Sequence, residues 1–520
     1  MNGAGGRRSL AVNAAWGLGG RVFQTLLQVF VTPIVIRLLG AEGYGVVAFG
    51  ATLFAIVAML DFAFGPVVQR LLNQGEASPE ERAHTRDLVF TLQLVSFALA
   101  ALITVTLVLG APFIARHALS ARHLSAGTLA AAVMLIGAGI GAQWPGLLYG
   151  GGFTALERQD RLVLIRTLGI TAQSLGGVLL LWLVAADPRL YLAWLAVVAG
   201  LMTLALGIGF WRLLPAARPA RLARRGLGPH LRFSSGSLVI GLQTAILTQA
   251  DKLIVARLAG LEAFAAYAVA TFAAMSVLAF TSASVVGSIL PRMTQRVAAR
   301  DPRGLGAVLH RTAQQVALAL LPAAATLAAF AQPVLAAWLG RSSPLVAPAA
   351  LLLPWCLAGV ALNGLIAVPF LMEMAGGRTF RVVRANMLAA PVFALACWFG
   401  VARHGAVFAA GAFIAVNLGY VVLLLPSIFA ANLGGRQYGE WLLRGAALPA
   451  GAAVLVATAG RLLVAGDAAL PAQLAAAGLT GICATLLCLA LLPEARDTLA
   501  TLVRRLRRRF MPAGGGPGDT

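Results

Sequence analysis

The stretch VIRLLGAEGYG at residues 35–45 is nearly repeated as VARLAGLEAFA at residues 255–265. Val, Arg, Leu, Gly and Glu recur at matching positions, at an offset of 220 residues. Each copy stands between two long apolar runs, so each is interpreted as the turn that joins two membrane-spanning helices. A chain that contains the same turn twice is expected to contain an internal duplication, as many transporters do.

The composition favours an all-α integral membrane protein. Hydrophobic residues make up 60% of the chain and charged residues only 11%, and the mean hydropathy is +0.86. A soluble domain needs more charge to cover its surface, and a chain in lipid must satisfy its backbone within helices or closed barrels. The four cysteines lie in apolar runs without metal-ligand spacing, so neither a metal site nor a disulfide framework is expected. They are Cys356, Cys397, Cys483 and Cys488.

The apolar runs predict fourteen spans. They lie approximately at 11–38, 44–70, 87–110, 124–149, 162–185, 190–213, 233–257, 263–290, 308–330, 345–373, 382–402, 405–429, 444–465 and 472–492. With the N-terminus in the cytoplasm, thirty of the forty basic residues, Arg166 among them, fall in cytoplasmic segments and eight on the opposite side. This asymmetry is a topology signal, so the net charge of +22 does not indicate nucleic-acid binding. It predicts a multi-pass membrane protein with both termini in the cytoplasm.

The duplication predicts two pseudo-symmetric lobes of six helices. Six spans separate the copies of the turn, and because six is even, both copies keep the same orientation in a parallel repeat. The predicted parts are an N-lobe at 1–213, a linker rich in Arg, Pro and Gly at 214–232 and a C-lobe at 233–430, followed by two helices at 431–493 and a basic tail at 494–520.

The residues of the repeated turn have a structural interpretation. Arg37 and Arg257 would end helices at their negative poles, and Glu42 would begin the next helix at its positive pole, as would Glu262. Gly40 and Gly260 suit the left-handed residue that ends many helices. A role in gating the outer mouth is the alternative.

A polar stripe on the first span marks the candidate cavity. Arg21, Gln24, Gln28 and Thr32 recur at helical spacing on one face, and Arg21 lies about 16 Å into the span, near the midplane. Span seven carries a matching stripe at the 220-residue offset: Thr244, Thr248 and Lys252. For the neutral side chains two interpretations stay open, cavity lining and helix–helix hydrogen bonding. For Arg21 a cavity is favoured, because a guanidinium keeps its charge.

The acidic residues in the spans have two possible roles. Asp61 and Asp251 could bind a coupling proton or cation, or neutralise a buried basic group, and neutralisation is favoured. Asp251 need not pair with Lys252, since helical neighbours point in different directions. Glu373 is expected to face water near a cytoplasmic helix end.

Two arginines are candidates for the inner mouth. Arg70 and Arg292 end spans two and eight on the predicted cytoplasmic side. Snorkelling to lipid headgroups is favoured over binding an anionic ligand there.

The predicted site chemistry combines three environments. Arg21 and Lys252 suit phosphate, and Gln24, Gln28 and the two threonines suit hydroxyl groups. A ligand with a phosphate, a sugar and a lipid tail would use the basic groups, the amides and the bilayer together. No catalytic residue, metal ligand, cofactor or nucleic-acid partner is expected, and the chain is not expected to be an enzyme.

Several motifs give the chain a family resemblance. They are NAAWGL at 13–18, RLLGAEGYG at 37–45, LDFAFGPVVQR at 60–70, GLLYGGGFTALERQDR at 146–161, QADKLIVARLAG at 249–260 and SILPRMTQR at 288–296. With these, the chain resembles the Wzx-type O-antigen flippases, in the polysaccharide-transporter branch of the multidrug/oligosaccharidyl-lipid/polysaccharide (MOP) superfamily. The resemblance implies transport of polyprenyl-diphosphate-linked oligosaccharide from the cytoplasmic to the outer leaflet by alternating access. It also implies that Arg21 contacts the diphosphate, with Lys252 sharing that role.

Three other functions are weighed against this one. A multidrug or cation antiporter of the same superfamily would place carboxylates deep in the cavity, whereas here Asp61 and Asp251 accompany Arg21 and Lys252. A membrane-embedded polymerase or ligase would need a larger outer loop than this sequence offers, and a scaffold without transport activity does not account for two polar stripes. Expected partners are the lipid-linked substrate, membrane lipids and polysaccharide assembly proteins.

Overall fold

The computed structural model describes residues 3–60, 64–74, 78–214, 218–223, 228–282 and 286–498, which form helices and turns with no strand among them. Contacts divide the chain into two compact units. The first comprises residues 1–269, 338–352 and 386–412, and the second comprises 270–337, 353–385 and 413–520. The basic tail beyond residue 498 and Asp61 both lie outside the described residues.

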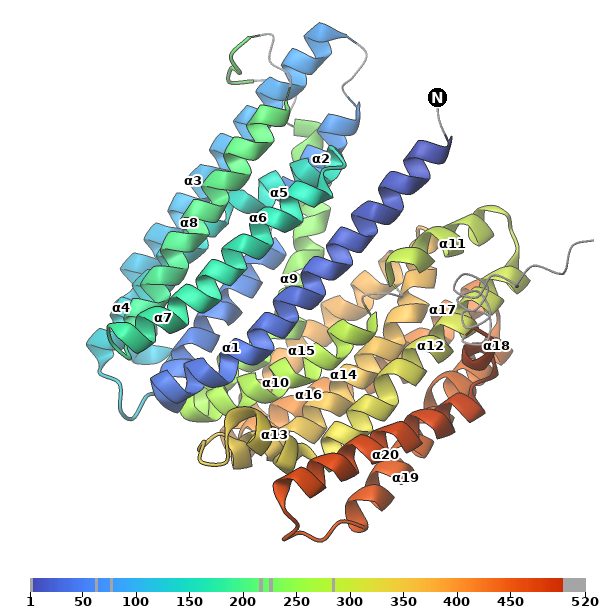
Figure 1. The fold of residues 1–520 in the computed structure, drawn as a ribbon. Helices are drawn as coiled ribbons and strands as arrows, with labels where there is room; N and C mark the ends of the chain where they lie inside the picture. The colour runs from blue at the N-terminus through green and yellow to red at the C-terminus, as the bar shows by residue number, and fades with distance from the viewer. Residues whose placement is uncertain are drawn as a thin grey trace, which may run out of the picture. The chain divides into compact units, whose positions relative to one another are not determined.

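The helices follow one another with short connections (Figure 1). The chain up to the start of the second unit forms α1 (Gly3–Leu60), α2 (Phe64–Gln74), α3 (Pro79–His117), α4 (Ala126–Gln143), α5 (Pro145–Ala155), α6 (Gln159–Thr171), the π-helix η2 (Ala172–Gly176), α7 (Gly177–Leu183), α8 (Pro188–Leu213), α9 (Gly228–Leu258) and α10 (Leu261–Ser282). The rest forms α11 (Val286–Ala298), α12 (Pro302–Ala329), α13 (Ala331–Leu339), α14 (Val346–Ala375), α15 (Phe380–His404), α16 (Ala406–Gly419), η3 (Tyr420–Leu424), α17 (Leu425–Asn432), α18 (Gly435–Glu440), η4 (Trp441–Ala447), α19 (Leu448–Leu462) and α20 (Leu470–Leu491).

The predicted fourteen spans are confirmed. Within the described residues, thirteen helical segments are long and apolar enough to cross a membrane, and the first of them, Gly19–Asn73, contains predicted spans one and two. The other twelve correspond one to one with predicted spans three to fourteen. Large side chains such as Leu109, Leu388 and Leu462 stay exposed on these helices, as expected for residues that face lipid.

Local signals in the sequence explain where the helices begin. Ser78 accepts a hydrogen bond from the backbone of Glu81, whose side chain accepts one from the Ser78 backbone, so a capping box starts α3. Ser125 caps α4 and Asp187 caps α8 in the same way, through backbone N–H groups of the first turn. Within α1 the backbone leaves helical geometry at Gly40, where φ is +72°.

The first unit packs through aromatic residues and glycines. α3, α4 and α8 lie side by side (Figure 1), and α2 packs against α5. A Cβ added at Gly151 would lie 2.6 Å from the Cα of Gly65, so α5 and α2 meet at backbone contact distance. Phe153 and Phe210 are fully buried beside this contact. Small residues that bring helices this close are typical of membrane bundles.

The second unit packs α12 against α19 and α20. Glu373, at the end of α14, is fully buried and does not face water, so that prediction was wrong. Its carboxylate accepts hydrogen bonds from Arg381 at 2.8 Å and from Asn432 at 3.1 Å. These partners lie at the ends of neighbouring helices, which the sequence alone does not bring together, and they compensate the cost of burying the charge.

Candidate functional site

α1 and α6 are in close contact where the predicted polar stripe begins. A Cβ added at Gly20 would lie 2.5 Å from Cγ1 of Val163. One turn further along, Nε2 of Gln24 donates a hydrogen bond to Oγ1 of Thr167 at 3.5 Å. The two helices therefore run side by side past Arg21, which lies between these two contacts on α1 and is exposed.

Arg166 adds a second guanidinium at this level. It lies on α6 between Val163 and Thr167, half-buried, and the room for it comes from Gly150, where an added Cβ would lie 2.6 Å from its NH2 group. Arg166 thus lies on the part of α6 that contacts α1 on both sides of Arg21. In the described part of the chain, neither forms an ion pair with a carboxylate.

Arg166, which was counted with the basic residues of the cytoplasmic side, lies inside the predicted span 162–185 and inside α6. It lies seven residues into α6, about 10 Å from the start of the helix at 1.5 Å per residue. The spacing of Arg166, Ile170 and Gln173 on one helical face is the signal that could have indicated this.

Gln28 lines a cavity of about 330 Å³ inside the first unit. Gln143, the last residue of α4, and Gln173, in η2, line the same cavity, whereas the rest of its wall is mostly apolar. Neither Gln143 nor Gln173 was among the predicted site residues, because nothing in the sequence indicates that α4 and η2 lie next to α1.

The predicted hydroxyl groups on α9 are bonded to their own helix. Thr244 donates to the carbonyl of Ile240 at 2.8 Å, and Thr248 donates to that of Thr244 at 2.7 Å. α9 packs against α1, and the Thr248 hydroxyl also contacts the sulfur of Met59 at 3.5 Å. The packing of α9 against α1 therefore places the two predicted stripes on neighbouring helices, while a role for the threonines in binding stays a prediction.

Asp251 and Lys252, whose pairing the sequence left open, form an ion pair. Nζ of Lys252 lies 3.6 Å from Oδ1 of Asp251 and donates a hydrogen bond to the carbonyl of Thr248. The long lysine side chain curls back along the helix, which a simple rule about neighbouring positions does not anticipate. Asp251 is buried, and its Oδ2 accepts a hydrogen bond from the hydroxyl of Tyr267 at 2.6 Å. This geometry agrees with the favoured charge-balancing role of Asp251.

The inner-mouth arginines are both exposed. Arg70 lies on α2 and Arg292 on α11. Exposure is compatible with headgroup contact and with ligand capture, so their roles stay predictions.

The two copies of the repeated turn meet in space. Gly260, like Gly40, has a positive φ, at +89°, which confirms the two predicted helix breaks. A Cβ added at Gly45 would lie 2.6 Å from the carbonyl oxygen of Leu261, so the first turn packs directly on the second. The backbone N–H of Leu261 donates to the carbonyl of Ser120 at 2.9 Å, which ties the second turn to the loop between α3 and α4.

The acidic residues of the two turns differ in role. The carboxylate of Glu42 is buried and accepts backbone hydrogen bonds from Arg122, His123 and Leu124, at 2.6 to 3.1 Å. Glu262 is exposed in the first turn of α10. Both copies of the turn thus hold the loop between α3 and α4. The first copy binds it through the carboxylate of Glu42, and the second through the backbone N–H of Leu261.

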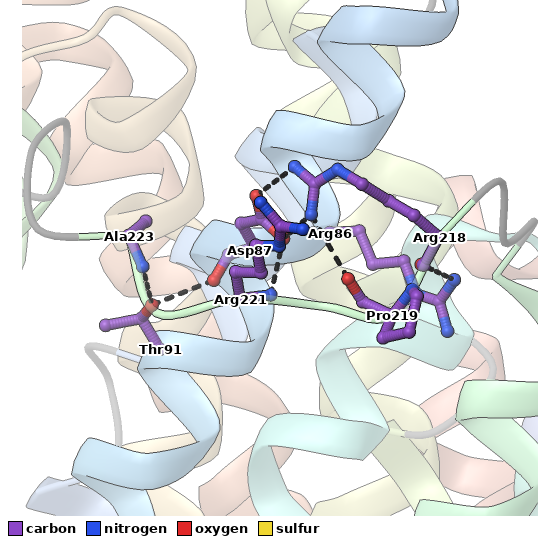
Figure 2. Close-up of polar contacts among 7 residues, drawn as sticks. All are labelled: Arg86, Asp87, Thr91, Arg218, Pro219, Arg221 and Ala223. Carbon is purple, nitrogen blue, oxygen red and sulfur yellow. Dashed lines mark hydrogen bonds and ion pairs between the residues drawn. The ribbon is translucent and has the colours of Figure 1, made fainter.

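Part of the linker is bound to the side of α3 (Figure 2). The carboxylate of Asp87 accepts two hydrogen bonds from the guanidinium of Arg218 and one from the backbone of Arg221. Thr91 accepts a hydrogen bond from the backbone of Ala223 at 2.8 Å, and Arg86 donates one to the carbonyl of Arg218 at 3.2 Å. Because Asp87 binds it, the pKa of the Arg218 guanidinium is raised above its usual range. We call residues 218–223 the strap.

A family model for "polysaccharide biosynthesis protein" matches residues 34–343. No curated protein matches the chain.

Several solved structures share the fold. The lipid II flippase MurJ in an inward closed conformation has a TM-score of 0.72 at 13% identity, with 94% of this chain and 100% of that chain covered. A multidrug resistance MATE family transporter of the MOP superfamily, facing inward, has a TM-score of 0.59 at 15% identity, covering 82% and 96%. A MOP superfamily transporter from Pyrococcus furiosus, described as having a binding pocket of reverse polarity, has a TM-score of 0.52 at 13% identity, covering 83% and 96%.

Proposed function

The chain belongs to the polysaccharide biosynthesis protein family and is a multi-pass membrane protein with the fold of MOP superfamily transporters. On this premise we propose that it moves polyprenyl-diphosphate-linked oligosaccharide from the cytoplasmic to the outer leaflet by alternating access. The product would serve the synthesis of a surface polysaccharide. Substrate binding is assigned to Arg21, Gln24 and Gln28 on α1, with Thr244, Thr248 and Lys252 on α9, two helices that pack against each other.

The observation that carries this proposal is the pair of guanidiniums of Arg21 and Arg166. Two like charges brought together within membrane-spanning helices repel each other unless an anion lies between or beside them. A guanidinium keeps its proton, so the repulsion is not relieved by deprotonation. A diphosphate presents several oxygens to bidentate donors and would neutralise both groups at once.

Topology supports the proposed direction and location. Even with Arg166 assigned to a helix, basic residues remain concentrated in alternate connections, which places both termini in the cytoplasm under the positive-inside rule. The expected location is the bacterial inner membrane, where the lipid-linked substrate would be loaded from the cytoplasmic leaflet.

A cation antiporter is the second candidate, and Asp251 is the observation that favours it. This carboxylate is buried, and its Oδ1 has no hydrogen-bond partner in the structure, as an ion-binding group in an empty site would be. However, Lys252 lies 3.6 Å from that oxygen and already supplies a positive charge. The guanidinium pair of Arg21 and Arg166 would repel a cationic substrate, so a cation antiporter does not account for it.

A flipping assay in proteoliposomes tests the proposal. A fluorescent polyprenyl-diphosphate-linked oligosaccharide starts in the inner leaflet of the vesicle. An external quencher reaches it only after the protein has moved it to the outer leaflet. The full chain is expected to accelerate this step, and Arg21→Gln and Arg166→Gln are each expected to slow it by about tenfold or more, because loss of a charge-assisted bidentate contact costs roughly 1.5–3 kcal/mol.

Arg341→Gln is the matched control, since Arg341 is an exposed arginine in the connection between α13 and α14. It is expected to flip lipid at the unaltered rate. Undiminished flipping by both Arg21→Gln and Arg166→Gln would remove the diphosphate contact from the mechanism, and flipping of a cationic dye in place of the anionic lipid would favour the antiporter.

A further inference from the structure

Three glutamine side chains from three different segments converge on one cavity. Gln28 comes from α1, Gln143 from the end of α4 and Gln173 from η2, and the cavity between them holds about 330 Å³. Nε2 of Gln173 donates to the carbonyl of Leu195 at 3.3 Å, which fixes that amide. In the described part of the chain, no protein hydrogen bond is made by the side-chain amides of Gln28 and Gln143, so their donors and acceptors remain available to a ligand.

The lining of the cavity selects a neutral ligand. No charged side chain is among the lining residues, so neither a phosphate nor a cation would find a counter-charge there. Primary amides carry both donors and acceptors, the combination that hydroxyl groups require. Apolar lining residues such as Phe54 and Ile140 offer a surface for the C–H face of a sugar ring. The volume equals that of about eleven liquid waters, so one hexose fits with several waters.

The cavity is in register with the guanidinium pair. Gln28 follows Arg21 by seven residues on α1, and Gln173 follows Arg166 by seven residues on the adjacent segment. Seven residues are close to two helical turns, so each glutamine lies near the face of its arginine, about 10 Å further along. The π-helical turn η2 carries Gln173, and such turns are frequent at functional sites.

We propose that the cavity lined by Gln28, Gln143 and Gln173 is a sugar subsite, which binds the first hexose attached to the diphosphate held by Arg21 and Arg166. This inference rests on the proposed function and adds to it the part of the first unit that recognises the glycan. Gln143 is a specificity residue, because it contacts the sugar and lies away from the diphosphate.

Binding of two defined probes to the purified full-length protein in nanodiscs tests the proposal. The probes are farnesyl diphosphate and farnesyl diphosphate that carries one glucose, titrated by calorimetry. The unaltered protein is expected to bind the glucosylated probe about tenfold more tightly, since two neutral hydrogen bonds contribute roughly that factor. Gln143→Leu is expected to abolish this ratio while leaving the affinity for farnesyl diphosphate unchanged, which also shows that the variant is folded.

Two further variants separate the outcomes. Arg166→Gln is expected to weaken both probes equally, and Gln249→Leu, which alters a half-buried glutamine of α9 outside the cavity, is expected to change neither affinity. Equal affinity of the unaltered protein for the two probes, or a tenfold ratio retained by Gln143→Leu, would overturn the sugar subsite but leave the proposed function standing. Failure of the unaltered protein to bind either probe would overturn the proposed function itself.

Discussion

Asp87 on α3 binds the guanidinium of Arg218, 131 residues further along the chain, through two hydrogen bonds of 3.1 and 2.5 Å. The carboxylate is mostly buried and also accepts the backbone N–H of Arg221. A single side chain thus fixes both ends of a four-residue stretch of the strap, and the segment after α8 is bound to the first unit before the chain continues to α9.

Asp87→Asn is expected to release the strap, because the neutral amide loses the charge-assisted contact to Arg218. Trypsin cleaves after arginine unless proline follows, so cleavage after Arg221 should become several-fold faster in the variant, whereas the bond between Arg218 and Pro219 stays intact. Limited proteolysis followed by mass spectrometry measures this rate. Asp160→Asn, which removes the exposed pair with Arg158, is the control. Equal protection of the strap in the two variants would contradict the role assigned to Asp87.

The two glutamates of the repeated turn should differ sharply on substitution. Glu42→Gln weakens three backbone contacts to a buried carboxylate and is expected to destabilise the protein by about 1.5–3 kcal/mol. Glu262→Gln, at the matching but exposed position, should have little effect. Thermal unfolding of both variants in detergent gives the comparison, and equal losses of stability would show that the carboxylate of Glu42 is not what holds the loop.

Asp251 and Lys252 should act as a unit. Asp251→Asn alone leaves a partly buried ammonium without its carboxylate and is expected to lower both abundance and flipping. The double variant Asp251→Asn with Lys252→Met removes both charges and should restore abundance, while flipping stays reduced because Lys252 is assigned to substrate binding. A stable double variant that has lost its dependence on an ion gradient would instead assign Asp251 to coupling.

The N-terminus of α12 should contribute stability that depends on pH. The backbone N–H of Gly304 and the guanidinium of Arg296 bind Asp301 and lower the pKa of its carboxyl. Because the pKa in the folded state lies below the unfolded value of about 3.9, this stabilisation is present above that pH and is lost as the pH falls through the folded pKa. Unfolding midpoints of the protein and of Asp301→Asn should differ at pH 6 and converge as the pH falls below the pKa of the folded protein. If the difference between the two unfolding midpoints stayed constant over this pH range, the carboxyl of Asp301 would not be the source of the pH-dependent stability.

The sequence predicts helices and turns well but not which helices are neighbours. Hydropathy alone located all fourteen spans, and Gly40 and Gly260 marked their breaks correctly. These features depend on residues close together in the chain. By contrast, the partners of Gln28 come from α4 and η2, and those of Glu373 from two other helix ends.

The errors have the same physical origin. Arg166 lies within the predicted span 162–185, but hydropathy does not indicate which neighbouring helix it faces. Only the glycine at position 150, on another helix, makes space for it inside the bundle. The binding role of the predicted stripe residues is still a prediction, while their neighbours in space are now defined.

The contact between Gly45 and Leu261 has an evolutionary consequence. A methyl group at position 45 would collide with the carbonyl oxygen of Leu261, yet the equivalent residue in the second copy is Ala265, which is itself fully buried. Selection at these two equivalent positions therefore differs, because glycine is required at position 45 whereas a methyl group is accommodated at position 265.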